Sequence, residues 1–288
     1  NHMKHPAELA LHQYLADAVN GKSTISEETI ERIGKDVTDA VRRQFGSGSR
    51  RKEFGLRMSN IGRPTCQLWF EKNKPEEALP KPVTFMFNMM LGDIVEAVFK
   101  GALTEAGIAF EECHAPVSLE LDTATVNGTY DLVIDGAVDD VKSASDWSYR
   151  NKFESFDTLH KGDSFGYVGQ LAGYAKASGK KAGGWWVVNK ANGAFKYVPA
   201  DNIDMDSEVA KLNSTAKTVE ANVFKRCFAP EVETFRGKTT GNTTLNSACV
   251  FCDYRYSCWP NMVERPSIPS QAKDPKITSY ITIAEEHM

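Results

Sequence analysis

Two runs of strand-forming residues flank the dipeptide Asp135-Gly136, and this pattern constrains the fold more than any other part of the chain. Asp-Gly between β-rich runs is the strongest short signal for a hairpin with a two-residue type I′ turn. In such a turn Ile134 pairs with Ala137. The register of the surrounding stretch, 127–145, then follows by counting outward.

The count brings four polar side chains together. Asp131 falls opposite Asp140, and Thr129 falls opposite Lys142; all four share one face because side chains alternate along a strand. Opposed carboxylates with Cβ atoms roughly 4.5–5.5 Å apart repel each other. A divalent cation between them would remove the repulsion, and Lys142 would lie beside it. A carboxylate pair, a hard cation and a lysine are the groups used to hydrolyse phosphodiesters. A solvated strand face with scattered charges is the alternative, and the hairpin alone leaves both open.

Composition sets the outer limits. The 288 residues suffice for one large domain or two small ones, and 41% hydrophobic and 25% charged residues are typical of a globular protein. The net charge of −4 gives no global basic signal, so a nucleic-acid site would be a local patch or would need a metal.

No secretory signal is recognised, and we expect a cytoplasmic protein. The apolar run 83–103 contains Asp93, Glu96 and Lys100, so we expect a buried helix and no membrane contact.

The remaining pattern predicts an α/β fold with a central mixed sheet flanked by helices. The basic segment 47–52 is either a solvated loop or a phosphate contact. After Pro260 we expect an extended surface tail. Predicted helices cover 4–20, 26–46, 83–105, 146–156, 164–178 and 203–224, and predicted strands besides the hairpin cover 109–121, 185–188 and 194–198.

Three further features are candidates for function. Glu96 lies among apolar residues of the long helix and either faces solvent or supplies a third oxygen ligand. Gln170 and Tyr174 are four residues apart and share a helix face. Aromatic residues could stack on bases or belong to the core: Trp147, Tyr149 and Phe165.

The cysteines cluster near the C-terminus. Cys249, Cys252 and Cys258 have the spacing Cys-x2-Cys-x5-Cys, which with a fourth thiolate suits an iron–sulfur cluster or zinc. The fourth ligand would come from the other cysteines: Cys66, Cys113 or Cys227. Free thiols in a surface loop are the alternative.

Together these residues resemble the PD-(D/E)XK nuclease superfamily, and more closely its RecB-like branch with an iron–sulfur cluster. That branch includes CRISPR-associated single-stranded DNA exonucleases, their phage relatives and the nuclease domain of AddAB-type helicase–nucleases. The resemblance covers roughly 66–260. Four segments match the family's motifs in order: Gly92–Glu96, Gly128–Asp131, Asp140–Lys142 and Gln170–Tyr174. Glu96 stands where this branch usually has a histidine, which replaces a nitrogen ligand by oxygen and would weaken a preference for manganese.

The resemblance implies a restriction-endonuclease-like core at 61–245, a helical region at 1–60 and a C-terminal cysteine region at 246–288. It implies Mg²⁺ or Mn²⁺ bound by Glu96, Asp131, Asp140 and the carbonyl of Val141, with Lys142 at the attacking water. Gln170 and Tyr174 would orient the substrate strand or Lys142. A 4Fe-4S cluster, rather than zinc, would be held by the family's cysteine set: Cys66, Cys249, Cys252 and Cys258.

The implied activity is that of a metal-dependent DNA nuclease, a single-stranded DNA exonuclease of recombination, repair or DNA processing in a bacterial or phage-infected cell. The alternative is a DNA-binding, complex-forming module on the same fold, which would serve a recombination or CRISPR adaptation assembly without cutting. The sequence leaves open the polarity of cleavage, the choice between DNA and RNA, and the oligomeric state.

Overall fold

The computed structural model describes residues 4–46 and 53–288. The chain folds into two compact units: unit 1 comprises Asn1–Gly62, Lys81–Gly162 and Tyr167–Ala216, and unit 2 comprises Arg63–Pro80, Asp163–Gly166 and Lys217–Met288. Both units are therefore assembled from separate segments, whereas the sequence suggested three consecutive regions. The basic segment 47–52 lies outside the described residues.

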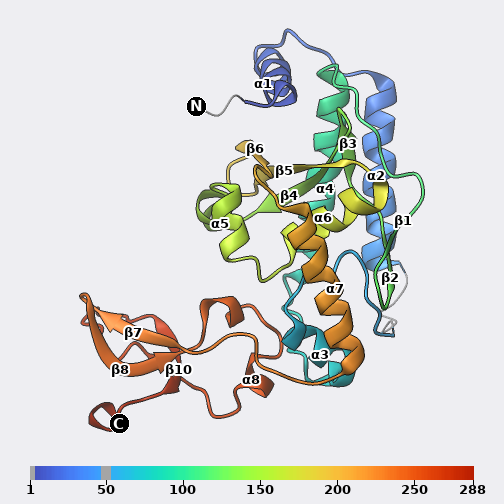
Figure 1. Ribbon diagram of the computed structural model, residues 1–288. Coiled ribbons are helices and arrows are strands. Elements are labelled where there is room, and N and C mark those ends of the chain that lie inside the picture. The colour runs from blue at the N-terminus through green and yellow to red at the C-terminus, as the bar shows by residue number, and fades with distance from the viewer. Residues whose placement is uncertain (1–3, 47–52) are drawn as a thin grey trace. The chain divides into compact units, whose positions relative to one another are not determined.

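A four-stranded mixed sheet forms the centre of unit 1 (Figure 1). Its order is β3-β4-β5-β6; β4 and β5 run parallel, and the other neighbours run antiparallel. The α/β class expected from the sequence is confirmed. The strands are β3 (Leu132–Ile134), β4 (Ala137–Ala144), β5 (Lys181–Asn189) and β6 (Phe195–Pro199).

The hairpin between β3 and β4 has the predicted turn and register. Asp135 and Gly136 have φ values of 49° and 75°, and a type I′ turn requires positive φ at both positions. Ile134 pairs with Ala137, and the ladder continues through two more pairs to Leu132 opposite Asp139. It ends there because β3 begins at Leu132, so neither expected pair beyond it, Asp131 with Asp140 or Thr129 with Lys142, forms part of the ladder.

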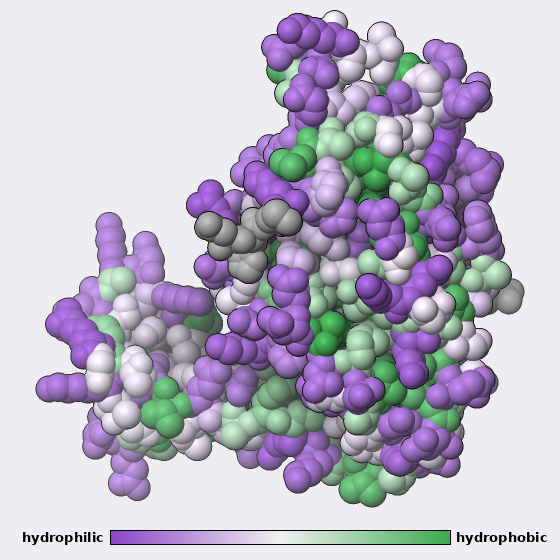
Figure 2. Space-filling view, turned by 45° about the horizontal axis from the view of Figure 1, so that its top comes forward, coloured by the Kyte–Doolittle hydropathy of each residue, from purple (hydrophilic) through white to green (hydrophobic). Residues whose placement is uncertain are grey.

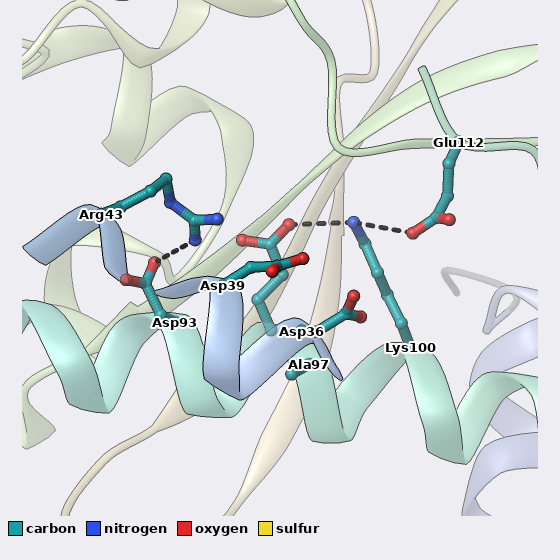
Figure 3. Close-up of a pocket in the computed structure, with 8 residues that line it drawn as sticks. Asp36, Asp39, Arg43, Asp93, Ala97, Lys100 and Glu112 are labelled. Carbon is teal, nitrogen blue, oxygen red and sulfur yellow. Dashed lines mark ion pairs between the residues drawn. The ribbon is translucent and has the colours of Figure 1, made fainter. Parts of the chain in front are cut away.

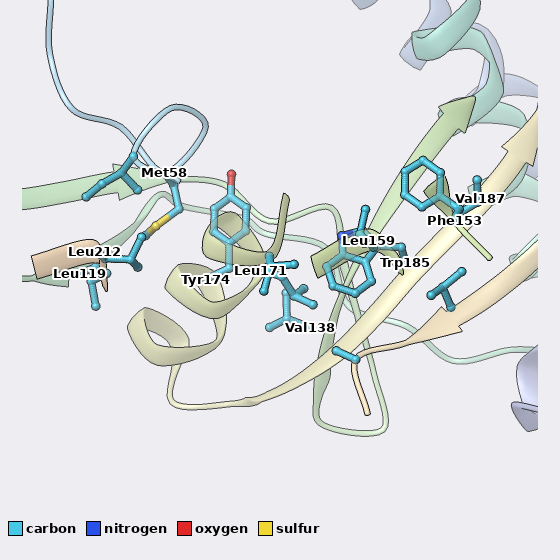
Figure 4. Close-up of a cluster of buried hydrophobic side chains, with 14 of the residues drawn as sticks. Met58, Leu119, Val138, Phe153, Leu159, Leu171, Tyr174, Trp185, Val187 and Leu212 are labelled. Atoms are coloured by element: carbon cyan, nitrogen blue, oxygen red, sulfur yellow. The ribbon is translucent and has the colours of Figure 1, made fainter. Parts of the chain in front are cut away.

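Helices cover both faces of this sheet. On one face, α1 (Pro6–Val19) and α4 (Phe85–Glu105) share a buried cluster with Val141 and Trp186. On the other, α6 (Tyr167–Ser178) packs over Val138 in the larger cluster (Figure 4). Alternation along β4 therefore sends Asp140 and Lys142 toward α6.

The other elements of unit 1 differ in part from expectation. The strand expected over 109–121 is confirmed only over its last part, as β1, which pairs with β2 in a separate two-stranded sheet; before it, Glu111 makes an isolated bridge to Val133. The helix expected over 146–156 forms only in part: a π-helical turn occupies 148–152, and a separate short α-helix begins at residue 156. The bounds are α2 (Glu27–Phe45), β1 (Val117–Glu120), β2 (Thr125–Gly128), η2 (Ser148–Lys152), α5 (Phe156–Lys161) and α7 (Met205–Ala221), the last of which continues into unit 2.

Unit 2 contains a second antiparallel sheet, with the order β7-β8-β10-β9. Two of its strands lie after Pro260, so the expected extended tail is wrong. Tyr280 of β10 is fully buried and donates its hydroxyl hydrogen to Glu233 at 2.7 Å. The elements are α3 (Thr65–Asn73), η1 (Pro75–Glu77), β7 (Glu231–Phe235), β8 (Lys238–Thr244), η3 (Ser247–Cys249), α8 (Arg255–Cys258), β9 (Val263–Pro266), β10 (Ile277–Thr282) and η4 (Glu285–His287).

Helix α4 is less buried than its sequence suggested. Phe87, Leu91, Ile94 and Val98 are exposed, although the C-terminal half of the helix is buried. On the face drawn in Figure 2, hydrophobic side chains are interspersed among hydrophilic ones. Over residues 4–46 and 53–288, none of the helices is both long enough and apolar enough to span a bilayer.

Candidate functional site

The candidate site lies where β3 has ended and β4 continues. The backbone N–H of Val141 donates to Asp131 Oδ2 at 2.8 Å, so the carboxylate of Asp131 takes the place of a strand partner. A strand residue directs its N–H and C=O to the same side. The carbonyl oxygen of Val141 therefore points to the side on which Asp131 lies, as its expected role as a ligand requires.

Asp140 is buried beside this position, and one of its carboxylate oxygens makes no hydrogen bond. Its Oδ2 has no hydrogen-bond partner, and the nearest positive group is Lys142 Nζ at 3.8 Å. A buried acceptor without a partner costs free energy comparable to a lost hydrogen bond, so such atoms mark strain, catalysis or an absent ion. The oxygen donors of Asp131, Asp140 and Val141 suit a hard divalent cation.

The carboxylates perturb one another. Burial and the neighbouring charge of Asp140 raise the pKa of Asp131 to about 6, against the lowering effect of Lys142. Burial, followed by Glu96, also raises the pKa of Asp140. Burial alone would lower the pKa of Lys142, but Asp140 and Asp131 more than offset this and raise it. Lys142 therefore stays protonated, and its single positive charge faces the two carboxylates of Asp131 and Asp140.

Helix α6 brings three side chains to the surroundings of Lys142. The Nζ atom of Lys142 lies 3.5 Å from Gln170 Oε1 and 4.6 Å from the centre of the Tyr167 ring. The amide of Gln170 donates to the Tyr174 hydroxyl at 3.4 Å. The structure thus brings Gln170 and Tyr174 together with Lys142, as predicted. Tyr167 was missed as a site residue; its position three residues before Gln170 was the available signal.

Glu96 takes part in this network through charge and is also bound to a lysine. Its pKa is raised by burial and then by Asp131. Lys100 Nζ lies 2.9 Å from Glu96 and 3.3 Å from Glu112. Dashed lines in Figure 3 mark the two ion pairs of Lys100. Neither ion pair of Lys100 was predicted from the sequence. The i,i+4 spacing was a signal for the pair of Glu96 and Lys100, whereas Glu112 lies in an irregular segment.

An acidic cavity of about 160 Å³ opens beside Glu96 (Figure 3). It lies between α2, α4 and the segment after α4. Arg43 and Lys100 are its basic residues, and each is paired with an acid: Arg43 with Asp93 at 3.8 Å, and Lys100 as described. The lining residues are Asp36, Asp39, Arg43, Asp93, Glu96, Ala97, Lys100 and Glu112.

Within 4–46 and 53–288, no three acidic, cysteine or histidine side chains are already arranged around one point as metal ligands. Lys100 helps to explain this for the carboxylates, because it holds Glu96 in an ion pair. A cation bound at Asp131 and Asp140 would recruit Glu96 only after Glu96 exchanged this partner.

The candidate cysteine centre lies wholly in unit 2. Cys66, Cys249, Cys252 and Cys258 all line one cavity of about 30 Å³. Four thiols without a competing acid or histidine are the donor set of structural zinc sites and iron–sulfur clusters. Cys113 belongs to unit 1 and is not among the residues that line this cavity.

The three aromatic candidates have different surroundings. Trp147 is 68% exposed, which excludes a core role. Tyr149 lies under Lys196 Nζ, 4.1 Å from its ring centre. Phe165, in unit 2, is 42% exposed, with its ring centre 6.4 Å from that of Phe251.

No protein-family model matches the chain, and no curated protein matches it. Among solved structures it is similar to "Crystal structure of SSO0001", with 12% sequence identity and a TM-score of 0.43. The similarity covers 81% of this chain and 96% of that chain.

Proposed function

We propose that the chain is a metal-dependent deoxyribonuclease with a PD-(D/E)XK-type, restriction-endonuclease-like core. Unit 1 would carry the chemistry, on the mixed sheet and the helices α4 and α6. By the resemblance of its motifs, the substrate is single-stranded DNA degraded from an end. The exposed ring of Trp147 supports such a substrate, because bases stack on exposed aromatic rings.

The observation that carries the proposal is the buried Oδ2 of Asp140, which makes no hydrogen bond and has only the ammonium of Lys142, 3.8 Å away, as a charged neighbour. Asp131 accepts from the backbone N–H of Val141, one residue after Asp140. A hydrophobic core would not retain a buried acceptor of this kind without a compensating partner. A cation supplies that partner, and Mg²⁺ and Mn²⁺ both accept oxygen ligands of this type.

Each side chain has a role in hydrolysis. Asp131, Asp140 and the Val141 carbonyl would hold the cation, and Glu96 would join them after leaving Lys100. The bound cation would activate water and neutralise charge on the phosphate. Lys142 would orient the attacking water and stabilise the negative charge of the pentacovalent phosphate. Gln170, bonded to Tyr174, would restrict the ammonium of Lys142 to one position.

The cysteine centre of unit 2 is proposed to be structural, with a 4Fe-4S cluster as the first candidate and zinc as the second. Hydrolysis transfers no electrons, so neither identity adds to the chemistry of unit 1. Metal binding would instead stabilise a unit whose segments come from distant parts of the chain.

The proposal is tested with end-labelled single-stranded DNA and either Mg²⁺ or Mn²⁺. We expect Asp140→Asn and Lys142→Ala to abolish metal-dependent cutting. Asp139→Asn is the matched control: it is the adjacent buried carboxylate, but it faces Trp186 and Tyr197 on the opposite side of the sheet. Equal loss in Asp139→Asn and Asp140→Asn, or cutting that survives both, would contradict the assignment.

One observation favours the alternative of a DNA-binding module that does not cut. The Glu96–Lys100 ion pair occupies a side chain that a working centre would need. If folded wild type binds single-stranded DNA but leaves it intact with both cations, this alternative replaces the nuclease.

A further inference from the structure

A second lysine lies beside the candidate site of unit 1. Lys152 Nζ lies over the ring of Tyr167, 4.6 Å from its centre, and Lys142 Nζ lies over the same ring at the same distance. The two ammonium groups therefore cannot be farther apart than twice this distance. Lys142 belongs to a motif recognised in the sequence, whereas Lys152 lies outside all four motif segments. All three residues belong to unit 1.

The backbone of Lys152 is held on both sides. Lys152 ends the π-helical turn η2, and the N–H of Phe153 closes this turn by donating to the carbonyl oxygen of Ser148 at 2.9 Å. The ring of Phe153 is buried and stacks on that of Tyr167, with the ring centres 6.0 Å apart. The carbonyl oxygen of Lys152 accepts from Thr158 Oγ1 at 3.4 Å. Single π-helical turns are rare and are frequent at functional sites, so η2 is a candidate for more than a connection.

The two lysines together favour an anionic ligand. A tyrosine ring attracts a cation only weakly, whereas two positive charges held at one ring repel each other. An anion that reaches both ammonium groups is attracted by both. One strand of DNA carries a negative charge for roughly every 3.4 Å of helix axis. Two neighbouring phosphates of one strand can therefore meet the two lysines within the limit that the ring sets.

We propose that Lys152 binds the phosphate next to the one that is cleaved at Lys142, and that Tyr167 positions both lysines. The inference rests on the proposed function only in taking a DNA strand as the ligand, and it involves no bond making or breaking. Lys152 would fix the register of the strand without reading its sequence, because phosphate contacts carry no sequence information. Trp147 precedes the same turn with its ring exposed, so one turn supplies both a phosphate contact and a base contact.

The test measures the binding of single-stranded DNA to full-length protein at a series of salt concentrations. Fluorescence anisotropy is recorded in EDTA and again in Ca²⁺. For a single strand, the slope of log affinity against log salt changes by about 0.7 for each phosphate contact. We expect Lys152→Gln to reduce the slope by about this amount, equally on strands of unrelated sequence, and Lys152→Arg to keep the slope of wild type.

Lys22→Gln is the matched control. It removes the same charge from an exposed position after α1, the helix on the other face of the sheet, and should leave the slope unchanged. Tyr167→Phe keeps the ring and should keep the slope, whereas Tyr167→Leu should reduce it as Lys152→Gln does. An unchanged slope in Lys152→Gln, or an equal reduction in Lys22→Gln, would overturn the contact. A lower thermal stability of Lys152→Gln with an unchanged slope would show that Lys152 only supports the turn.

Cleavage with Mg²⁺ is measured separately. We expect Lys152→Gln to raise KM with little change in kcat, whereas Lys142→Ala lowers kcat. If wild type and the variants bind with the expected slopes but wild type never cuts, the nuclease is wrong and the phosphate contact stands. If wild type binds no single-stranded DNA in EDTA or in Ca²⁺, the phosphate contact is wrong, whatever its cleavage shows.

Discussion

Asp139 and Asp140 are adjacent, both are buried, and they face opposite sides of the sheet. Asp139 accepts hydrogen bonds from Trp186 Nε1 at 3.1 Å and from the Tyr197 hydroxyl at 2.7 Å, so both its oxygens have partners. Asp140 Oδ2 accepts no hydrogen bond and has only the ammonium of Lys142 nearby, at 3.8 Å. Two adjacent aspartates thus have different surroundings. Packing alone explains only the carboxylate of Asp139, whose two oxygens both accept hydrogen bonds.

Asp139 should make stability depend on pH. Burial raises its pKa to about 7 from 3.8, so the folded state holds this proton more tightly than the unfolded chain. The free energy of unfolding should then fall as the pH rises between these values and level off above them. The fall is about 4 kcal/mol, at roughly 1.4 kcal/mol per unit.

Asp139→Asn keeps the shape of the side chain and removes the charge. We expect its unfolding free energy to decline less than that of wild type between about pH 4 and about pH 8, as measured by urea denaturation. Titrations elsewhere in the molecule are common to both proteins and cancel in the difference. Parallel pH profiles for the two proteins would show that Asp139 is not the group responsible.

At this scale, counting from one turn predicted that Asp131, Asp140 and Lys142 lie close together, and the structure brings them together although Asp131 lies just outside the ladder. Their role as a site stays a prediction. The i,i+4 spacing on α4 was a signal for the ion pair of Glu96 with Lys100. The second partner of Lys100, Glu112, could not be identified, because it meets Lys100 only after α4 and an irregular segment have been placed beside each other, and no local pattern fixes that placement.

At the scale of elements, the end of β2 approaches α6 so closely that only glycine fits. A Cβ on Gly128 would lie 2.5 Å from Met58 Cβ and 2.9 Å from Tyr174 Cε1. This glycine begins the Gly-x-x-Asp segment that ends at Asp131. The close approach is what allows Tyr174 to stand beside the strand and hold Gln170 by its hydroxyl.

Gly128→Ala should therefore destabilise the protein by roughly 1–3 kcal/mol through overpacking and should displace Tyr174. Gly162→Ala is the matched control, since no atom lies within 4 Å of the added Cβ and its φ is negative. Thermal unfolding of both variants gives the comparison. If the two variants have equal stability, the contact with Tyr174 does not constrain this position.

The sequence predicted the sheet of unit 1 far better than that of unit 2. Asp135-Gly136 and Asn192-Gly193 are strong hairpin signals, and each lies between strands of the first sheet. In the second sheet, β7 and β8 are joined through Arg236-Gly237, whose φ values of 52° and 79° are also positive, but arginine is not a usual turn residue. Strands rich in threonine and glutamate have no buried alternation to reveal them.

For the whole molecule, the proposed centre matters because unit 2 is assembled from three separate segments. Cys66 comes from the first of them, and the remaining proposed ligands come from the last. A metal held by both would link them covalently through its thiolates, which stabilises the folded unit against the unfolded chain.

Cys252→Ser should lower the stability of unit 2 more than it changes the DNA cleavage of the protein that remains folded. Limited proteolysis would show this as cleavage within 217–288, while unit 1 stays protected. Specific activity is then measured on the folded fraction. A variant that is as stable as wild type, has lost the metal and keeps normal activity would contradict a structural role for the centre.

The division of unit 2 also has a consequence during protein synthesis. A ribosome delivers Cys66 early, then the strands and helices of unit 1, and only afterwards Cys227 and the final three cysteines. Cys66 must therefore wait, reduced and without its partners, while the rest of the chain is translated. Cys227 is the first of these later cysteines to emerge, so its sulfur can accept the hydrogen bond from the backbone N–H of Cys66 before the C-terminal cysteines leave the ribosome.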